Sequence, residues 1–411
     1  NIMAGVGIVF CLVLVTGSYP AWYLSSLSSV SVLKGKWIYS GKQWLRALLV
    51  VVQFAISAIL IMGTLVVYGQ MNYLRTKDLG FSKEQIVVVA IPRSDSIGQK
   101  IPILKNKLLQ NSRVHHVSIG PKPAGFYGKT SFIKEVNGQK ADQFVNFNTI
   151  DEDYLALLKI NLVAGRNFSK DMPSDRTNAV IVNEAFVKWM GWKEAVGQKF
   201  SNDPKVTQTV IGVVRDFHYT SLHNQIEPML LFYNTDNPIN LLVNIRPTDL
   251  DVVRSAWEAL IPNRPFEYSF LDTEFEAQYR QEEKMMTLFT WFSALTLLIA
   301  CLGLFGLASF ATIQRTKEIG VRKVLGANIS SIVLLLSKDF IQLVLIANLL
   351  SWPLAYWGTH QWLENYAFRM DISPWMFVLP TLLVLIIALL TVSFQTWRAA
   401  RQNPVKALRY E

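Results

Sequence analysis

The chain has 411 residues, of which 51% are hydrophobic and 17% are charged, and its mean hydropathy is +0.25. This balance excludes an ordinary soluble globule, which is less apolar, and an all-membrane bundle, which is less charged, so it predicts a membrane part joined to a soluble part. The formal net charge is +10. Much of the positive excess lies beside apolar segments, which indicates membrane topology and anionic lipid headgroups rather than a nucleic-acid partner.

The first candidate span covers residues 2–24, which are apolar and uncharged. About 20 such residues cross a bilayer. The basic segment that follows has no acidic residue and holds Lys34, Lys36, Lys42 and Arg46, which predicts the cytoplasmic side. A signal peptide is the alternative, but a charged leader and a clean cleavage site are lacking. Because the sequence begins inside this apolar run, we expect a further part of the protein before it.

The second candidate span covers residues 47–69. Its clearly polar residues, Gln53 and Ser57, lie about one helical turn apart and therefore face the same way. We expect them to contact another helix of the bundle rather than a substrate.

Residues 70–284 contain no segment that could cross a membrane, so they predict a soluble domain of about 200 residues. Helical patterns cover residues 101–110 and 251–260. Runs of β-branched and apolar residues predict strands at residues 85–92, 178–186, 207–217, 239–247 and 266–271. Strands mixed with helices in this way favour an α+β domain.

Residues 272–286 are polar, rich in helix formers, and run directly into the apolar residues 288–311. We predict one long helix whose polar part projects about 20 Å from the membrane, at 1.5 Å per residue, and acts as a stalk. The stalk residues that we single out are Phe275, Tyr279, Glu282 and Lys284. Within the span, Gly303 and Gly306 would allow close contact with another helix.

Residues 314–327 form a short segment between two apolar runs, with Arg315, Lys317, Arg322 and Lys323 against Glu318. The positive-inside rule places such a loop in the cytoplasm. Apolar Ile319, Val321 and Leu325 alternate with these charges, and Gly320 and Gly326 lie where a helix could begin or end. The pattern predicts a short amphipathic helix offered to a cytoplasmic partner. A basic loop that only fixes topology is the alternative.

The remaining sequence holds two further spans. Residues 328–340 are amphipathic, a span follows at about residues 340–357 with Pro353 as a kink, and residues 358–374 form an outside loop. The last span covers residues 375–394, and the tail after it is basic. About five spans then place every basic loop on one side and the large domain on the other.

The segment QRTKEIGVRKVLGA, together with the preceding ACLGLFGLASF, resembles the FtsX/MacB family of ABC-transporter permeases. The runs YLALLKINLVAGRNFS, IVNEAF and IGVVRDFH resemble the periplasmic domain of MacB-type permeases. The resemblance implies a bacterial inner membrane protein with a periplasmic domain. It also implies a cytoplasmic ABC ATPase as partner, and this partner, rather than the present chain, would bind ATP. The residues that would contact this ATPase are Arg315, Lys317, Glu318, Ile319, Gly320, Arg322, Lys323, Leu325 and Gly326.

GSYPAWYLSSLSSVSVLKG near the start parallels VSFQTWRAARQNPVKALRYE at the end, which indicates a repeated module. We therefore assign residues 1–36 to the last span and tail of a preceding permease module, and residues 37–70 to the first span of this one. Residues 71–271 are the MacB-like periplasmic domain, and residues 272–411 are the stalk and a three-span FtsX-like domain. The expected fold is a membrane α-helical bundle with an inserted α+β extracytoplasmic domain and a helical stalk.

The chain shows no pattern of catalysis. It has no GxxxxGK[ST] phosphate loop and no GxSxG elbow. Cys11 and Cys301 lack metal-ligand spacing, and adjacent His115 and His116 would point to opposite faces of a strand. We expect no enzyme activity, cofactor or metal site in this chain. For His218 and His223 we expect surface or packing roles rather than metal ligation.

We therefore expect the permease subunit of an ABC transporter, which couples ATP hydrolysis to movement of the periplasmic domain. The family resemblance implies export of amphiphilic or antimicrobial compounds, lipoprotein extraction or mechanotransmission across the envelope. The spans carry almost no charge, which argues against an ion pathway. The alternative is a membrane-anchored sensor or scaffold without an ATPase. The resemblance is also compatible with a periplasmic or outer-membrane partner.

Overall fold

The computed structural model describes residues 43–92, 94–123, 125, 127–136, 139–203, 206–236, 238–315, 318–319, 321–322 and 325–400. They belong to two compact units. One unit comprises Ile59–Ala294 and Trp352–Pro380, and the other holds the described residues of Asn1–Ala58, Leu295–Ser351 and Thr381–Glu411.

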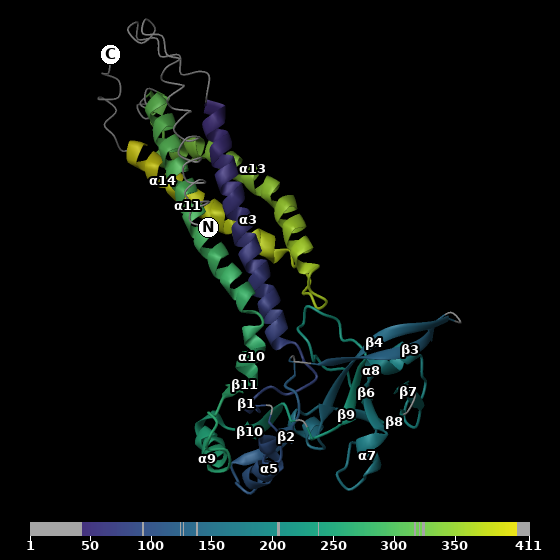
Figure 1. Cartoon of the computed structure of the whole chain (residues 1–411). Coiled ribbons are helices and arrows are strands. Elements are labelled where there is room, and N and C mark those ends of the chain that lie inside the picture. The colour runs from purple at the N-terminus through teal and green to yellow at the C-terminus, as the bar shows by residue number, and fades with distance from the viewer. Residues whose placement is uncertain are drawn as a thin grey trace, which may run out of the picture. The chain divides into compact units, whose positions relative to one another are not determined.

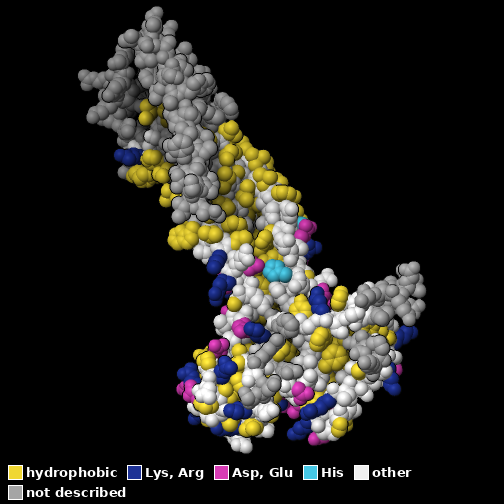
Figure 2. All heavy atoms as spheres, viewed as in Figure 1, with side chains coloured by type: hydrophobic (Ala, Val, Ile, Leu, Met, Phe, Trp, Pro, Cys, Tyr) yellow, Lys and Arg dark blue, Asp and Glu magenta, His cyan; other side chains and the backbone are white. Residues whose placement is uncertain are grey.

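Among the described residues, four long helices have the length and the apolar composition to cross a membrane: α3 (Gln43–Thr76), α11 (Arg280–Gln314), α13 (Ile329–Leu363) and α14 (Trp375–Ala400). Hydrophobic side chains cover their visible surfaces, whereas charged side chains gather on the α+β domain (Figure 2). These helices confirm the expected membrane bundle for the described part of the chain. The predicted first span, the preceding module at residues 1–36 and the tail beyond residue 400 lie outside the described residues.

The helix ends differ from the sequence prediction. α3 continues to Thr76, past the predicted end of its span at residue 69. α13 is one helix that contains Pro353 and reaches Leu363. The prediction of an outside loop from residue 358 was therefore wrong, and the loop between α13 and α14 is residues 364–374. Buried Leu363 and the packing of Trp362 against the domain core keep the last turn helical.

One glycine contact confirms an expected approach between α3 and α11. A Cβ at Gly303 would come within 3.1 Å of Gln53 Oε1, so glycine lets the two helices pack closely. Ser57 is buried, and its hydroxyl donates to the Gln53 carbonyl oxygen of its own helix. A Cβ added at Gly306 would meet no atom of another helix within 4 Å among the described residues, so the expected close contact at Gly306 is not seen in them.

The α+β domain contains a four-stranded antiparallel sheet in the order β11-β1-β10-β2 (Figure 1). Its strands are β1 (Ile86–Ala90), β2 (Val114–Ile119), β10 (Asn240–Ile245) and β11 (Tyr268–Phe270). Helices α5 (Ile101–Leu109) and α9 (Leu250–Leu260) cover one face of this sheet. Because side chains alternate along a strand, Val87 and Val89 pack with these helices, whereas Ile86 and Val88 join the core on the other face.

A second, mixed sheet has the order β3-β4-β9-β6-β8-β5, with β7 also paired to β8. Its strands are β3 (Gly128–Val136), β4 (Gln139–Ile150), β5 (Leu162–Gly165), β6 (Ala179–Asn183), β7 (Lys199–Asp203), β8 (Val206–Val214) and β9 (Met229–Tyr233). The short helices are α4 (Asp95–Gly98), α6 (Tyr154–Leu157), α7 (Ser174–Thr177), α8 (Glu184–Met190) and the 3₁₀ turn Pro247–Asp249. The predicted α+β class is confirmed.

The predicted strands correspond to β1, β6, β8, β10 and β11, and the predicted helices to α5 and α9. Strands β2, β3, β4, β5, β7 and β9 were missed. The strand predicted through residue 186 ends at Asn183, whose side chain accepts a hydrogen bond from the Phe186 N–H. That contact is an N-cap, so α8 begins at Glu184 in place of a longer strand.

A buried ionic cluster joins the two sheets where β4 ends. Asp151 is 0% exposed and accepts hydrogen bonds from Ser118 Oγ at 2.6 Å and from Ile119 N at 2.7 Å, both on β2. Lys105 of α5 donates to the same carboxylate at 2.7 Å and to Asp153 at 2.6 Å. A buried charge needs such partners, and here they hold the chain after β4 against β2 and α5.

The expected continuous stalk helix is wrong, because the structure has two helices. α10 (Leu271–Ala277) ends before Gln278, and α11 begins at Arg280. The N–H groups of Gln278 and Tyr279 bond to carbonyls three residues back, at 3.3 and 3.0 Å, as in a tight turn. The Tyr279 hydroxyl accepts a hydrogen bond from Leu222 N at 3.1 Å. This anchor in the domain interior redirects the chain at the break.

Candidate coupling segment and domain-side junction

The segment between α11 and α13, residues 315–328, contains a short helical stretch, and we call it the coupling segment. Glu318, Ile319, Val321 and Arg322 are helical. Ile319 N bonds to the Arg315 carbonyl at 2.9 Å. The stretch ends in a turn where Gly326 has φ +89°, a left-handed conformation that glycine adopts without strain. The local sequence therefore builds a compact element. Lys317, Gly320 and Lys323 lie outside the described residues.

The described charges of this segment are paired within the chain. Arg315 Nη2 lies 3.1 Å from Asp339 Oδ2 of α13, and Arg322 Nη2 lies 2.7 Å from Glu318 Oε1, one helical turn away. All four side chains are about half exposed. Exposed pairs of this kind contribute about 0.2–1 kcal/mol, so a protein partner that offers carboxylates would exchange with them at small cost.

The apolar side chains of the segment divide between two faces. Ile319 and Ala327 pack against buried Leu336 of α13. Val321 and Leu325 are 50% and 80% exposed. Two exposed aliphatic side chains beside a cation form the kind of surface that a protein partner covers, with an apolar centre and a charged rim.

A second group of contacts joins the ends of the long helices to the α+β domain within one unit. We call it the domain-side junction and define it by the following residues: Gln70, Arg75, His223, Tyr279, Glu282, Glu283, Tyr366, Phe368 and Met370. Gln70 of α3 is 0% exposed. Its Nε2 donates to the Phe368 carbonyl and its Oε1 accepts from Met370 N, both at 2.9 Å. One amide thus ties α3 to the loop between α13 and α14.

Glu282 connects α11 to the same loop and to the domain. Its Oε1 lies 3.2 Å from His223 Nε2 and 3.3 Å from the Tyr366 hydroxyl. The rings of His223 and Tyr366 stack at 4.2 Å between centroids, and Ala367 N donates to the His223 carbonyl at 3.0 Å. Burial raises the pKa values of the Tyr366 and Tyr279 hydroxyls, so both stay protonated at neutral pH.

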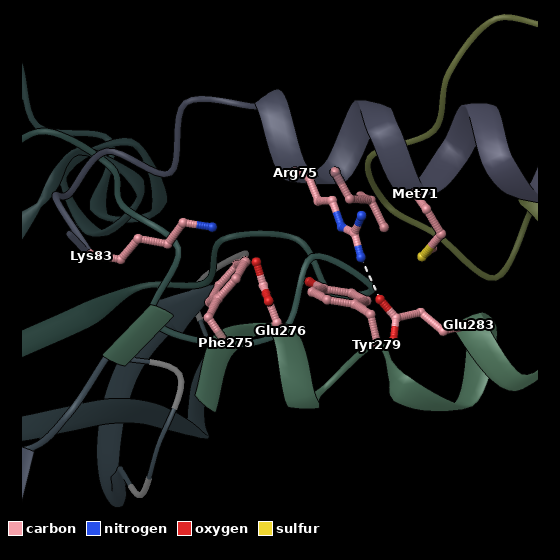
Figure 3. A pocket seen from close by; sticks show the side chains of 8 residues that line it. Met71, Arg75, Lys83, Phe275, Glu276, Tyr279 and Glu283 are labelled. Atoms are coloured by element: carbon pink, nitrogen blue, oxygen red, sulfur yellow. Dashed lines mark hydrogen bonds and ion pairs between the residues drawn. The ribbon is translucent and has the colours of Figure 1, made fainter. Parts of the chain in front are cut away.

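α3 and α11 also meet through an ion pair between Arg75 and Glu283 (Figure 3). The two side chains point toward each other across a narrow pocket that Phe275 and Tyr279 border. Both charged side chains are about half exposed. The pair therefore orients the helices and adds little stability compared with the buried Gln70 contacts.

Residues 290–404 match the family of FtsX-like permease C-terminal domains. This part of the chain is an FtsX-like permease domain. It contains most of α11, the coupling segment, α13 and α14. The expected resemblance to FtsX-like permeases is thereby confirmed for this part of the chain, and the four long apolar helices make the chain a multi-pass membrane protein. The comparison with curated proteins found no match.

The structure is also similar to three solved structures. The periplasmic region of MacB from Actinobacillus actinomycetemcomitans has 16% identity and a TM-score of 0.34, over 48% of this chain and 94% of that one. A domain of a putative permease protein from Porphyromonas gingivalis has 14% identity and a TM-score of 0.32, over 46% and 91%. The extracellular domain of the ABC-type transporter YknZ from Gram-positive bacteria has 15% identity and a TM-score of 0.31, over 45% of this chain and 97% of that one.

The structure separates the four predicted stalk residues. Phe275 and Tyr279 are buried in the domain core, and Glu282 is largely buried in the domain-side junction. Lys284 is exposed. Sequence reasoning missed Gln70 as a functional candidate, although a buried polar residue at the end of an apolar helix is a usable signal. It also missed the partners that Glu282 finds on other elements.

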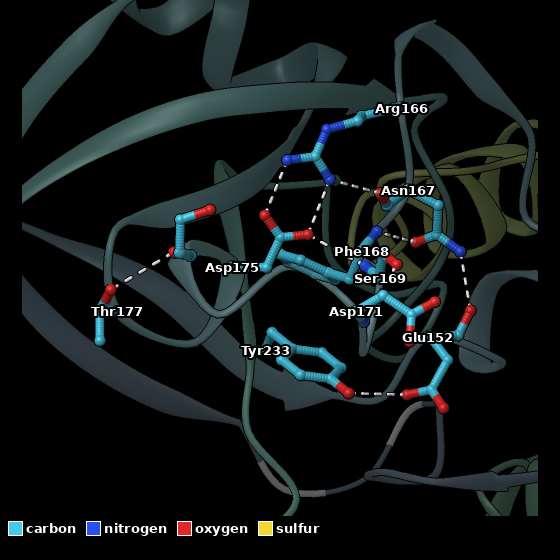
Figure 4. Close-up of polar contacts among 10 residues, drawn as sticks. Glu152, Arg166, Asn167, Phe168, Ser169, Asp171, Asp175, Thr177 and Tyr233 are labelled. Atoms are coloured by element: carbon cyan, nitrogen blue, oxygen red, sulfur yellow. Dashed lines mark hydrogen bonds and ion pairs between the residues drawn. The ribbon is translucent and has the colours of Figure 1, made fainter.

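Inside the α+β domain, a second cluster of polar side chains stabilises the fold (Figure 4). Arg166 makes two 2.7 Å hydrogen bonds to the Asp175 carboxylate, which also accepts from Ser169 N at 3.0 Å. These bonds hold the pKa of Asp175 below its usual value. Nearby, Tyr233 donates to Glu152 at 2.9 Å. Each of these side chains is hydrogen-bonded to a neighbour, so the cluster stabilises the conformation of the chain between β5 and β6.

The described residues contain no group of three or more His, Cys, Asp and Glu side chains that could hold a metal ion. His115 and His116 are both exposed on β2. His218 is buried, and its ring meets the Phe368 ring edge-on at 4.6 Å. His218 therefore has a packing role, whereas His223 both stacks on Tyr366 and contacts the Glu282 carboxylate.

Proposed function

We propose that this chain is the membrane subunit of an ABC transporter in the bacterial inner membrane. A separate cytoplasmic ATPase binds ATP and contacts the coupling segment, and the chain itself catalyses no reaction. The observation that supports this proposal is the exposed face of Val321, Arg322 and Leu325 within an FtsX-like domain. The surplus of basic residues beside the spans favours the cytoplasm for this segment and the periplasm for the α+β domain.

In this proposal the domain-side junction passes movement to the α+β domain. Gln70 and Glu282 carry contacts from α3 and α11 to the loop at residues 364–374 and to His223 of the domain. A displacement of either helix would therefore act on buried, directional hydrogen bonds rather than on a flexible connection. Export of amphiphilic compounds, lipoprotein extraction and envelope mechanotransmission would each use such a movement. We also propose that a preceding permease module of the same protein and a periplasmic or outer-membrane protein are partners of this chain.

The coupling segment is tested with Leu325→Ala in the full-length protein, reconstituted in lipid nanodiscs with ATPases encoded nearby. Burying a leucine at an interface contributes about 1.5–3 kcal/mol, so the variant should bind the ATPase about tenfold or more weakly. Leu334→Ala is the matched control, because Leu334 is similarly exposed, at 71%, on α13. Reversing the charge of Arg322 and Lys323 should also lower ATPase stimulation.

If no candidate ATPase binds the unmodified protein, the permease proposal is wrong and a sensor or scaffold becomes the better assignment. If Leu325→Ala and Leu334→Ala weaken binding equally, the ATPase contacts another surface.

Transmission is tested separately with Lys284→Pro, since Lys284 is exposed in α11. Proline inside a helix costs about 3 kcal/mol and breaks it. The variant should retain ATPase affinity and lose the ATP-dependent change in hydrogen exchange of the α+β domain, whereas Lys284→Ala should keep both. A full domain response in Lys284→Pro would exclude α11 as the transmitting element.

A further inference from the structure

Three long helices surround a half-enclosed cavity of about 300 Å³. It lies in the unit that also contains the α+β domain, between parts of α3, α11 and α13. The lining includes Gly63 and Val67 of α3, Met285 and Phe289 of α11, and Gly358 and Trp362 of α13. The volume is at the lower end of the range for small-ligand pockets, about 300–1,000 Å³.

The cavity exists because two glycines place no side chain there. A Cβ at Gly63 would lie 3.7 Å from the Phe289 ring, and one at Gly358 would meet no atom of the described residues within 4 Å. Thr359 is the polar side chain of the lining, and its hydroxyl donates to the Ala355 carbonyl of its own helix at 2.7 Å. The walls therefore offer apolar contact, and such a cavity favours hydrocarbon over water.

The cavity lining is extended along α3 and α13, and it covers one turn of α11, from Met285 to Phe289. Its lining on α3 runs from Ile59 to Val67, and on α13 from Leu354 to Trp362. Both stretches extend about 12 Å at 1.5 Å per residue. A small volume spread over this length fits a single alkyl chain parallel to the helices.

The carboxylate of Glu282 lies outside the cavity lining, about one helical turn before Met285 on α11. Glu282 precedes Met285 by three residues, so both project from the same face of α11. Tyr366, which bonds to Glu282 Oε1, packs against the Trp362 ring at 5.0 Å between centroids. Glu282 Oε2 is buried and has no hydrogen-bond partner among the described residues. A buried oxygen of this kind is costly until a donor reaches it.

We propose that this site binds one acyl chain of a bilayer lipid whose headgroup carries a primary amine. The chain fills the cavity, and the ammonium group donates to Glu282 Oε2. Bilayer lipid is the favoured occupant because it surrounds the helices at high concentration, so that a modest affinity is sufficient to fill the site. The lipid would then join α3, α11 and α13 directly beside the domain-side junction. This assignment does not depend on coupling to an ATPase.

The test uses the full chain in nanodiscs containing a phosphatidylethanolamine with a photoreactive group in one acyl chain. Labelling should concentrate on peptides covering residues 59–67, 285–289 and 354–362. The same chain on phosphatidylcholine, whose headgroup has no N–H, should label these peptides about tenfold less, since hydrogen bonds to charged groups are the strong ones. Equal labelling by the two lipids would overturn the amine assignment.

Three variants complete the test. Gly358→Leu should fill the cavity and abolish the selective labelling, whereas Gly306→Leu, also at an open position on a span, should leave it unchanged. Glu282→Gln should make the two lipids equal without removing the acyl chain. Unchanged labelling in Gly358→Leu would overturn the site. Loss of labelling when a partner ATPase hydrolyses ATP before the photoreaction would identify a transported amphiphile and overturn the assignment to a resident lipid.

Discussion

Gln70→Leu should release the loop between α13 and α14 from α3. The substitution keeps the side-chain size and removes both the donor to the Phe368 carbonyl and the acceptor for Met370 N. Each hydrogen bond contributes about 0.5–1.5 kcal/mol net, so the loss should be about 1–3 kcal/mol in the free energy of local opening. This loss corresponds to a rise of about 5–150-fold in the exchange rate of the Met370 amide.

The measurement is hydrogen–deuterium exchange of the full chain in nanodiscs, with fragments that resolve Met370. Ser57→Ala is the matched control, because Ser57 is also buried on α3 but bonds only to its own helix. Unchanged exchange at Met370 in Gln70→Leu would refute the argument that this amide holds the loop. An equal rise in Ser57→Ala would show general loosening of α3 instead.

Two further predictions concern the α+β domain. Asp151→Asn should lower the free energy of unfolding by about 3–5 kcal/mol, because it removes the fully buried carboxylate that pairs with the Lys105 ammonium and leaves only the partly exposed Asp153 beside it. Asp153→Asn, at a carboxylate 41% exposed, should cost about 1 kcal/mol or less. Equal losses in chemical denaturation would contradict this. Burial, reinforced by Lys77, lowers the pKa of His218 to about 4 from its usual 6.5. The unfolded chain then binds more protons than the folded one between these values, so stability should fall as pH drops from about 6.5 to about 4. His218→Phe should reduce that fall, and an NMR titration of His218 near pH 6.5 would contradict the assignment.

The spans and the domain class were predictable because they depend on local composition. Crossing a bilayer requires about 20 apolar residues in one stretch, whatever their neighbours, and α3, α11, α13 and α14 each show such a stretch. The strands β1, β8 and β10 were found because β-branched residues concentrate there. β3 and β4 were missed because they are long strands with many polar residues. They are held together by pairing with each other in a hairpin, and their sequences lack the apolar pattern that predicts a strand.

The sequence by itself determined that this chain is a membrane protein with an FtsX-like segment, since hydropathy, charge and motif are properties of short stretches. Only the tertiary structure decided that the stalk breaks at Gln278 and Tyr279, because the Tyr279 hydroxyl is held by Leu222, a residue distant in sequence. It also decided the Gln70 contacts and the cavity beside Gly358, which require helices and a loop from far-apart positions to meet. Such contacts depend on packing between elements, and no local pattern encodes them.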